Sequence, residues 1–184
     1  VGLVGVISAD VTLNIPDFRS PERTFQLITQ AAGRAGRGER PGKVIVQTYS
    51  PEHYAVQTAA AQDYRAFYKI EDLVRRQIGY PPYCDLVQII LTADSEEEAA
   101  LASEKVKASF LRRVGRGESG RVLGPRPSPL NRVKGQYRYQ ILIKSPPECR
   151  ERDWAALMGV KNKVAREKEK EWGFLIDVNP YSSL

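Results

Sequence analysis

The sequence has few of the residues from which metal sites and disulfides are built. It holds two cysteines, Cys84 and Cys149, and one histidine, His53, among 184 residues. The cysteines lie far apart, which argues against a disulfide framework and against zinc bound by this chain alone, since a structural zinc site takes four ligands. No apolar run approaches the roughly 20 residues of a membrane-spanning helix. We therefore expect a globular protein of the reducing cytoplasm, without a metal site or a membrane partner.

The chain carries a moderate excess of positive charge. Lys and Arg number 28 against 22 Asp and Glu, which gives a formal net charge of +6. Such an excess favours a polyanionic partner, but many proteins with a similar charge bind none. Its distribution says more, because basic residues without any acidic residue occupy the segment from Gly120 to Lys144, and we interpret them as contacts to a phosphate backbone. They are Arg121, Arg126, Arg132, Lys134, Arg138 and Lys144.

The first fifty residues predict part of an α/β layer. Residues 1–7 form an apolar, β-branched run, which predicts a strand buried on both faces, as in a parallel sheet. Ser20, Pro21 and Glu22 supply the N-cap, first-turn proline and first-turn acid of a helix. The segment GERPG ends that helix, and residues 43–50 predict a second buried strand. A buried strand is a poor beginning for a domain, so we expect its neighbouring strands to lie upstream.

The predicted helix carries the pattern Gln-x-x-Gly-Arg-x-Gly-Arg. Gln30, Arg34 and Arg37 recur at i, i+4 and i+7 and therefore share one face of the helix. Gly33 and Gly36 each weaken a helix by about 1 kcal/mol relative to alanine, a cost that is understandable where a ligand or another backbone comes close. Taken alone, the arginines also fit a helix C-terminus paired with nearby acidic residues.

The remainder predicts a helical connector followed by an α+β domain. Residues 52–79 have helix-forming composition, with Tyr64, Phe67, Tyr68 and Leu73 available for packing. Beyond Tyr83 the order is strand, helix, strand, strand, helix, strand, which predicts a ferredoxin-like arrangement of two helices on one face of an antiparallel sheet. Its second strand, GRVLGP, is expected to be short and to precede a proline-rich loop. The predicted domains are residues 1–50, the connector 51–82 and the carboxy-terminal domain 83–184.

The strand predicted over residues 137–144 alternates between two kinds of side chain. Tyr137 and Tyr139 alternate with Arg138 along the strand. Because side chains two positions apart share a face, Lys144 lies on the same face as Arg138. We expect the tyrosines to belong to the core rather than to stack on bases, and the two cations to face a nucleic acid. A merely solvated sheet face is the alternative.

An ordered series of segments resembles the PriA family of primosomal replication-restart helicases. The series is SADVTLNIPDFRSPERTFQLITQAAGRAGR, GKVIVQT, DYRAFYKIEDLVRRQIGYPPY, GPRPSPLNRVKGQYRYQILIK and DVNP, and it covers essentially the whole chain. The resemblance implies that QAAGRAGR is motif VI of a superfamily-two helicase, on the second RecA-like lobe. The Walker A loop, the Mg²⁺-binding acidic motif, the zinc-binding cysteines and the amino-terminal DNA-binding domain of the family are missing from this sequence. Alone, the chain is expected to be a carboxy-terminal fragment without ATPase activity.

The resemblance also implies roles for individual residues. Gln30, Arg34 and Arg37 become catalytic residues of the cleft between the lobes, with Arg37 as the arginine finger. Gly33, Arg34 and Arg37 are implied ATP contacts. Arginine suits this role because its planar and permanently charged guanidinium can neutralise charge on a transferring phosphoryl group. Asp10 follows a strand end where α/β sheets present functional groups, although a turn residue bonding its own backbone fits equally well. ATP with Mg²⁺, and zinc, are implied for the intact parent, with none bound by this chain alone.

The parent implied by the resemblance is a bacterial ATP-dependent helicase of 3′ to 5′ polarity that restarts replication at stalled or branched forks by primosome assembly. Its implied partners are forked or single-stranded DNA, the acidic tail of single-stranded-DNA-binding protein and other primosome proteins. Arg150 and Arg152 are candidates for the contact to that tail. One alternative is that the basic surface binds the acidic tail and no DNA. Another is a non-enzymatic nucleic-acid or protein docking module of ferredoxin-like fold, which explains the basic segment but not motif VI.

Overall fold

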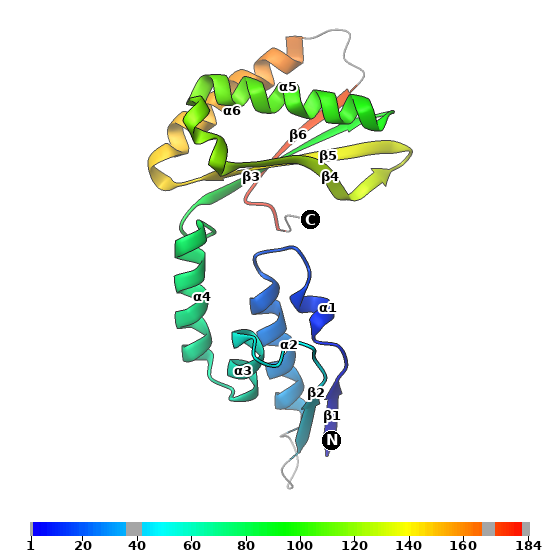
Figure 1. The fold of residues 1–184 in the computed structure, drawn as a ribbon, viewed down its shortest axis with the longest axis vertical. Helices are drawn as coiled ribbons and strands as arrows, with labels where there is room; N and C mark the ends of the chain where they lie inside the picture. Colours follow the sequence, from blue (N-terminus) through cyan, green and yellow to red (C-terminus); the bar gives the residue numbers. More distant parts are fainter. Residues whose placement is uncertain (1, 36–41, 167–171, 182–184) are drawn as a thin grey trace. The chain divides into compact units, whose positions relative to one another are not determined.

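The computed structural model describes residues 2–35, 42–166 and 172–181, which belong to two compact units (Figure 1). The first unit comprises Val1–Ile78 and the second Gly79–Leu184. Among the described residues, no helix combines the length and the apolar composition that crossing a membrane requires. The elements of the first unit are β1 (Leu3–Val6), α1 (Asp10–Leu13), α2 (Ser20–Ala35), β2 (Lys43–Val46), α3 (Tyr54–Ala60) and α4 (Tyr64–Ile78).

In the first unit, β1 and β2 form a two-stranded parallel sheet, and α2 packs against it (Figure 1). This is the predicted order of strand, helix and strand, with an additional short helix, α1, in the segment expected to be a loop. The prediction that the first strand is buried on both faces is wrong for this chain, since Leu3 is 58% exposed and Ile7 is 82% exposed. In the described part of the chain β1 pairs only with β2, so the outer edge of each strand has no neighbouring strand.

The helical connector consists of two helices, α3 and α4. Gln62 adopts a left-handed backbone conformation with φ of +53°, which ends α3, and the Asp63 carboxylate then accepts a hydrogen bond from the Ala66 N–H in the first turn of α4. Phe67 is buried and stacks on Phe25 of α2, with ring centroids 4.4 Å apart. Only this edge of α4 enters the core, and the other three side chains expected to pack are more than half exposed: Tyr64, Tyr68 and Leu73.

The second unit has the element order predicted for residues 83–184. Its four strands follow the spatial order β4-β5-β3-β6, and every neighbouring pair is antiparallel. The helices α5 and α6 lie on the same face of the sheet (Figure 1). The elements are β3 (Asp85–Ala93), α5 (Glu96–Val114), the 3-10 helix η1 (Arg116–Arg121), β4 (Val122–Val133), β5 (Gln136–Ser145), the 3-10 helix η2 (Pro147–Cys149), α6 (Arg150–Arg166) and β6 (Trp172–Val178).

The core of the second unit lies between the sheet and the two helices. The Ser95 hydroxyl accepts a hydrogen bond from the Glu98 N–H at 3.2 Å and so caps α5. The apolar residues Ala99, Ala102, Val106 and Phe110 recur at helical spacing and form one stripe of α5, which is buried. It packs against alternate residues of the two central strands and against α6, whose buried contributions include Leu157, Val160 and Val164.

The strand β4 continues through the segment expected to be a loop. It runs along one border of the sheet past Pro125, Pro127 and Pro129, with register irregularities on either side of Pro127. Proline lacks the N–H that a central strand must donate, but a border strand with bulges tolerates it. A two-residue turn at Lys134 and Gly135, both at positive φ, leads into β5.

Gly124 occupies a position in β4 that a side chain does not fit. Its φ is +92°, and a Cβ would lie 2.7 Å from the backbone oxygen of Gln140. We expect Gly124→Ala to lower the free energy of unfolding of the second unit by about 1–3 kcal/mol. Urea titration followed by tryptophan fluorescence measures this, because Trp154 and Trp172, the two tryptophans, both belong to the second unit. Gly117→Ala, where a Cβ meets nothing within 4 Å, serves as the control, and equal midpoints for the two variants would contradict the prediction.

Candidate functional site

The predicted ATP-contacting residues lie near the end of α2. Gln30 and Arg34 are exposed, and a Cβ at Gly33 would meet nothing within 4 Å, so the described residues leave open space there. Arg37 and Gly36 lie outside the described residues. The acidic residues suggested as helix-capping partners of the arginines have other ion pairs: Asp17 with Arg23 and Glu22 with Arg75.

A buried ion-pair network holds α2 against α3 and α4. Arg75 donates from Nε to Glu71 at 2.7 Å and from Nη2 to Glu22 of α2 at 2.8 Å. The Tyr54 hydroxyl of α3 donates to the same Glu71 carboxylate at 2.5 Å. Burial and this hydrogen bond to a carboxylate both raise the pKa of Tyr54, so its hydroxyl stays a donor. The exposed motif therefore lies on a helix whose other end is fixed by charged contacts.

Asp10 joins the ends of the two strands of the first unit. Its carboxylate is buried and accepts hydrogen bonds from the Thr48 hydroxyl at 2.9 Å and from the Tyr49 N–H at 3.1 Å. Burial raises the pKa of Asp10, but the hydrogen bonds from Tyr49 and Thr48 outweigh it and lower the pKa overall. The carboxylate thus connects α1 to the segment after β2, across the two strands of the sheet.

Three of the six basic residues in the predicted phosphate-binding segment lie on the helix-free face of the sheet. Arg138 and Lys144 of β5 alternate with Ile141 and Ile143, which face the helices, and Arg126 of β4 pairs in register with Gln140 on the helix-free face. Lys144 Nζ lies 3.9 Å from the centroid of the Tyr80 ring. The strands β4 and β5 carry no acidic residue, so their half of this face is positive, whereas β6 places Asp177 on the same face beside Gln88 of β3.

Arg121 has an internal role. Its guanidinium donates to Asp153 of α6 at 2.7 Å, to Glu118 at 2.6 Å and to the Lys144 carbonyl at 2.7 Å. Asp153 is buried, and its carboxylate also accepts a hydrogen bond from the Ser145 hydroxyl at 2.8 Å. With these partners the Arg121 guanidinium is committed to holding η1, β5 and α6 together instead of facing solvent.

Arg132 and Lys134 lie near the β4–β5 turn. The Arg132 guanidinium lies 5.1 Å from the centroid of the Tyr137 ring, and Lys134 is exposed in the turn itself. Arg132 lines an open cavity together with acidic residues that begin α5, and the Tyr139 hydroxyl donates to one of them, Glu96. These acids reduce the attraction of Arg132 for phosphate. The acidic members of that cavity are Asp94, Glu96 and Glu97.

The two candidates for protein contact begin α6. Arg150 is 60% exposed and donates to Asp85 at 2.5 Å, whereas Arg152, 43% exposed, forms an ion pair with Glu118 at 3.0 Å. Arg150 also lines a largely apolar cavity of about 330 Å³. Its apolar walls come from Val87, Trp154, Leu157 and Val178.

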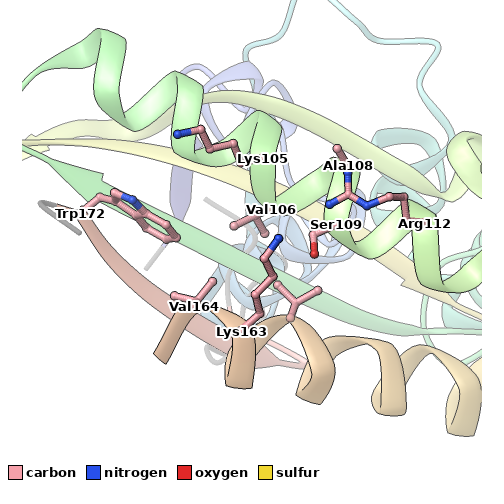
Figure 2. A pocket seen from close by; sticks show the side chains of 9 residues that line it. Lys105, Val106, Ala108, Ser109, Arg112, Lys163, Val164 and Trp172 are labelled. Carbon is pink, nitrogen blue, oxygen red and sulfur yellow. The ribbon is translucent and has the colours of Figure 1, made fainter. Parts of the chain in front are cut away.

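A third cavity, whose basic lining residues were not predicted from the sequence, lies between α5 and α6 (Figure 2). Its basic residues Lys105 and Arg112 are seven positions apart on α5, and Lys163 comes from α6. The i, i+7 spacing, which places Lys105 and Arg112 on one side of the helix next to its apolar stripe, is the signal that the sequence offers. The histidine has a structural place, since His53 Nδ1 accepts a hydrogen bond from the Ala55 N–H at the start of α3.

Comparison with known proteins agrees with the resemblance found in the sequence. The sequence profile of the Primosomal protein N C-terminal domain matches residues 76–181, which include every element of the second unit. The replication restart protein PriA of Bacillus subtilis (strain 168) is 46% identical over 182 residues, which is 98% of this chain and 22% of the relative. The proteins of the same name from Synechocystis sp. and Thermotoga maritima are 38% and 37% identical over 79% of this chain, and over 17% and 19% of their own lengths. This chain therefore spans only a minor part of the relatives it matches, and it belongs to the PriA family, whose C-terminal domain it contains.

Proposed function

We propose that this chain is the carboxy-terminal part of an ATP-dependent DNA helicase that restarts replication at stalled or branched forks. The relatives are named replication restart proteins, and the motif on α2 is of the type by which helicases contact ATP. In this proposal the first unit is the end of a second RecA-like lobe followed by a helical connector. The second unit is a ferredoxin-like domain, an assignment supported by its strand order and by both helices lying on one face.

The motif residues would act on ATP held mainly by the other lobe of the parent. Exposed Gln30 and Arg34, with open space at Gly33, fit a nucleotide approaching the end of α2. Bound Mg²⁺ would neutralise charge on the phosphates, and the arginines Arg34 and Arg37 would stabilise the charge that spreads over the transferring phosphoryl group. The zinc implied for the parent has no group of three or more ligands among the described residues, so no step of the proposal uses it.

The second unit would bind the DNA backbone through its helix-free sheet face. The observation that carries this proposal is that Arg126, Arg138 and Lys144 share that face while β4 and β5 contribute no carboxylate. Phosphate contacts of this kind supply affinity and orientation without reading the base sequence. A fork-binding domain needs this property, because stalled forks occur at any sequence.

Fluorescence anisotropy with a labelled fork and a labelled single strand, repeated over a salt series, tests the DNA face. We expect Arg126→Ala with Arg138→Ala to weaken binding at low salt and to reduce the log-log salt slope by about 0.7 per lost contact on single strands. Arg116→Ala, an exposed arginine of η1, is the control and should leave the slope unchanged. No binding of the unmodified chain at low salt, or an unchanged slope in the double variant, would contradict the proposal.

The start of α6 is the proposed contact for the acidic tail of single-stranded-DNA-binding protein, and other primosome proteins are proposed partners of the parent. The apolar walls of the cavity beside Arg150 support this role, since an apolar side chain of the tail would contact them. The carboxylates of Asp85, Glu151 and Asp153 in the same lining reduce its attraction for the acidic part of the tail, which would meet Arg150. If the chain binds the tail peptide but neither labelled DNA, and Arg126→Ala with Arg138→Ala weakens binding of the peptide, the basic face serves the tail instead. We place the parent in the bacterial cytoplasm, at replication forks.

A further inference from the structure

The cavity between α5 and α6 has an apolar floor and a basic rim (Figure 2). Its volume is about 210 Å³. Val106, Val160 and Val164 are buried and form the floor, and the half-buried ring of Trp172 at the start of β6 forms one wall. This volume is comparable to one large apolar side chain. None of these residues belongs to the motif on α2, to the helix-free sheet face or to the start of α6.

Three cations surround this opening, and none of the described residues that line it is acidic. Lys105 and Arg112 come from α5 and Lys163 from α6, and all three are exposed. Within the described ranges of the chain, none of them forms an ion pair with a carboxylate. Figure 2 shows the three basic side chains distributed around the apolar residues of the cavity. The cavity is therefore complementary to a ligand that combines several negative charges with one apolar group.

The apolar floor of the cavity favours a peptide side chain over a nucleobase as the bound group. A nucleobase carries ring donors and acceptors, and each one that is buried without a partner costs about 1–3 kcal/mol. Among the described lining residues, Ser109 alone carries a hydroxyl, and this hydroxyl already accepts a hydrogen bond from Arg113 at 2.8 Å. Valine side chains offer no further partner, whereas they suit an aliphatic or aromatic side chain, which could also stack on Trp172.

We propose that this cavity binds an acidic peptide segment of a partner protein, which inserts one large apolar side chain between α5 and α6. Carboxylates on either side of that side chain meet Lys105, Arg112 and Lys163. The apolar insertion and the basic rim both supply affinity, as buried anchors and complementary charges do in other interfaces, and the rim also accelerates association and selects acidic sequences. The site is separate from the DNA face and does not depend on it.

Binding of an end-blocked, fluorescent peptide to the full chain tests the proposal. The probe carries aspartates on both sides of one phenylalanine, and a second peptide has serine in place of the phenylalanine. We expect Arg112→Glu with Lys163→Glu to weaken binding of the first peptide at least about tenfold. The control double variant, Arg116→Glu with Lys161→Glu, makes the same change in net charge at exposed positions outside the cavity and should stay within about threefold of the unmodified chain.

Further binding measurements test which chemical group enters the cavity. The serine peptide should bind the unmodified chain at least about fivefold more weakly than the phenylalanine peptide, because the apolar anchor is lost. In a Trp154→Phe background, the emission of Trp172 should shift when the phenylalanine peptide binds. Equal loss in both double variants, binding that ignores the phenylalanine, or loss on Arg150→Glu alone would overturn the proposal. The proposal would also be overturned if the double variant Arg112→Glu with Lys163→Glu lost more affinity for labelled oligothymidylate than for the phenylalanine peptide.

Discussion

On the proposed function, replacement of Arg37 by alanine in the full-length protein is expected to reduce ATP hydrolysis by about 10³- to 10⁵-fold. The reason is that an arginine finger stabilises charge only as the phosphoryl group transfers, so its loss falls on the chemical step and not on binding of DNA. Arg37 lies three residues beyond Arg34, whose side chain is exposed on the last turns of α2. The measurement is the steady-state ATPase rate at saturating single-stranded DNA, together with the affinity for that DNA.

Two further variants make the Arg37 result specific. Arg37→Lys keeps the positive charge but loses the planar fork, so it should restore only a small part of the rate. Arg65→Ala removes an exposed arginine of α4 and should leave the rate near that of the unmodified helicase. A rate for Arg37→Ala within about tenfold of the unmodified enzyme would remove Arg37 from the site, since arginine fingers contribute more than that.

Asp153→Ala is expected to lower the free energy of unfolding of the second unit by about 3–5 kcal/mol. Asp153 is 1% exposed and accepts hydrogen bonds from Arg121 at 2.7 Å and from Ser145 at 2.8 Å. Its removal leaves the partly buried Arg121 guanidinium without its main partner, and that uncompensated charge is the source of the loss. Urea titration followed by tryptophan emission reports this unit alone.

The control for this prediction is Glu151→Ala, because Glu151 is an exposed acid of the same helical turn. Its midpoint should change little, as surface substitutions usually do. The double variant Arg121→Met with Asp153→Leu replaces the pair by apolar groups and should be more stable than Asp153→Ala. If Asp153→Ala unfolds at the same urea concentration as Glu151→Ala, the network contributes nothing to stability.

The sequence patterns predicted those elements in which periodicity and burial agree. The i, i+3 and i+4 spacing of Ala99, Ala102, Val106 and Phe110 indicated one face of α5, and that face is the buried one. The alternation around Arg138 likewise indicated β5, because opposite faces of a strand meet different environments. In these segments local pattern and tertiary packing impose the same requirement.

Other features depended on groups distant in the sequence. Nothing near Arg121 indicates that its partner is Asp153, 32 residues later on another helix, so its charge looked free for phosphate. The prolines of β4 indicated a loop, because a border position in the sheet is not visible in the sequence itself. The cavity beside Trp172 is formed by three elements together, and no single segment carries its pattern.

The two borders of the sheet differ in a way that affects how molecules of this protein meet one another. Along β4, Pro125, Pro127 and Pro129 offer no N–H, and the register irregularities interrupt the regular spacing of the remaining groups. A foreign strand therefore finds no continuous ladder there, which is how natural sheets avoid edge-to-edge aggregation. At the opposite border, β6 has no proline within Trp172–Val178. Self-association by strand exchange, under conditions that loosen the fold, would accordingly begin at β6.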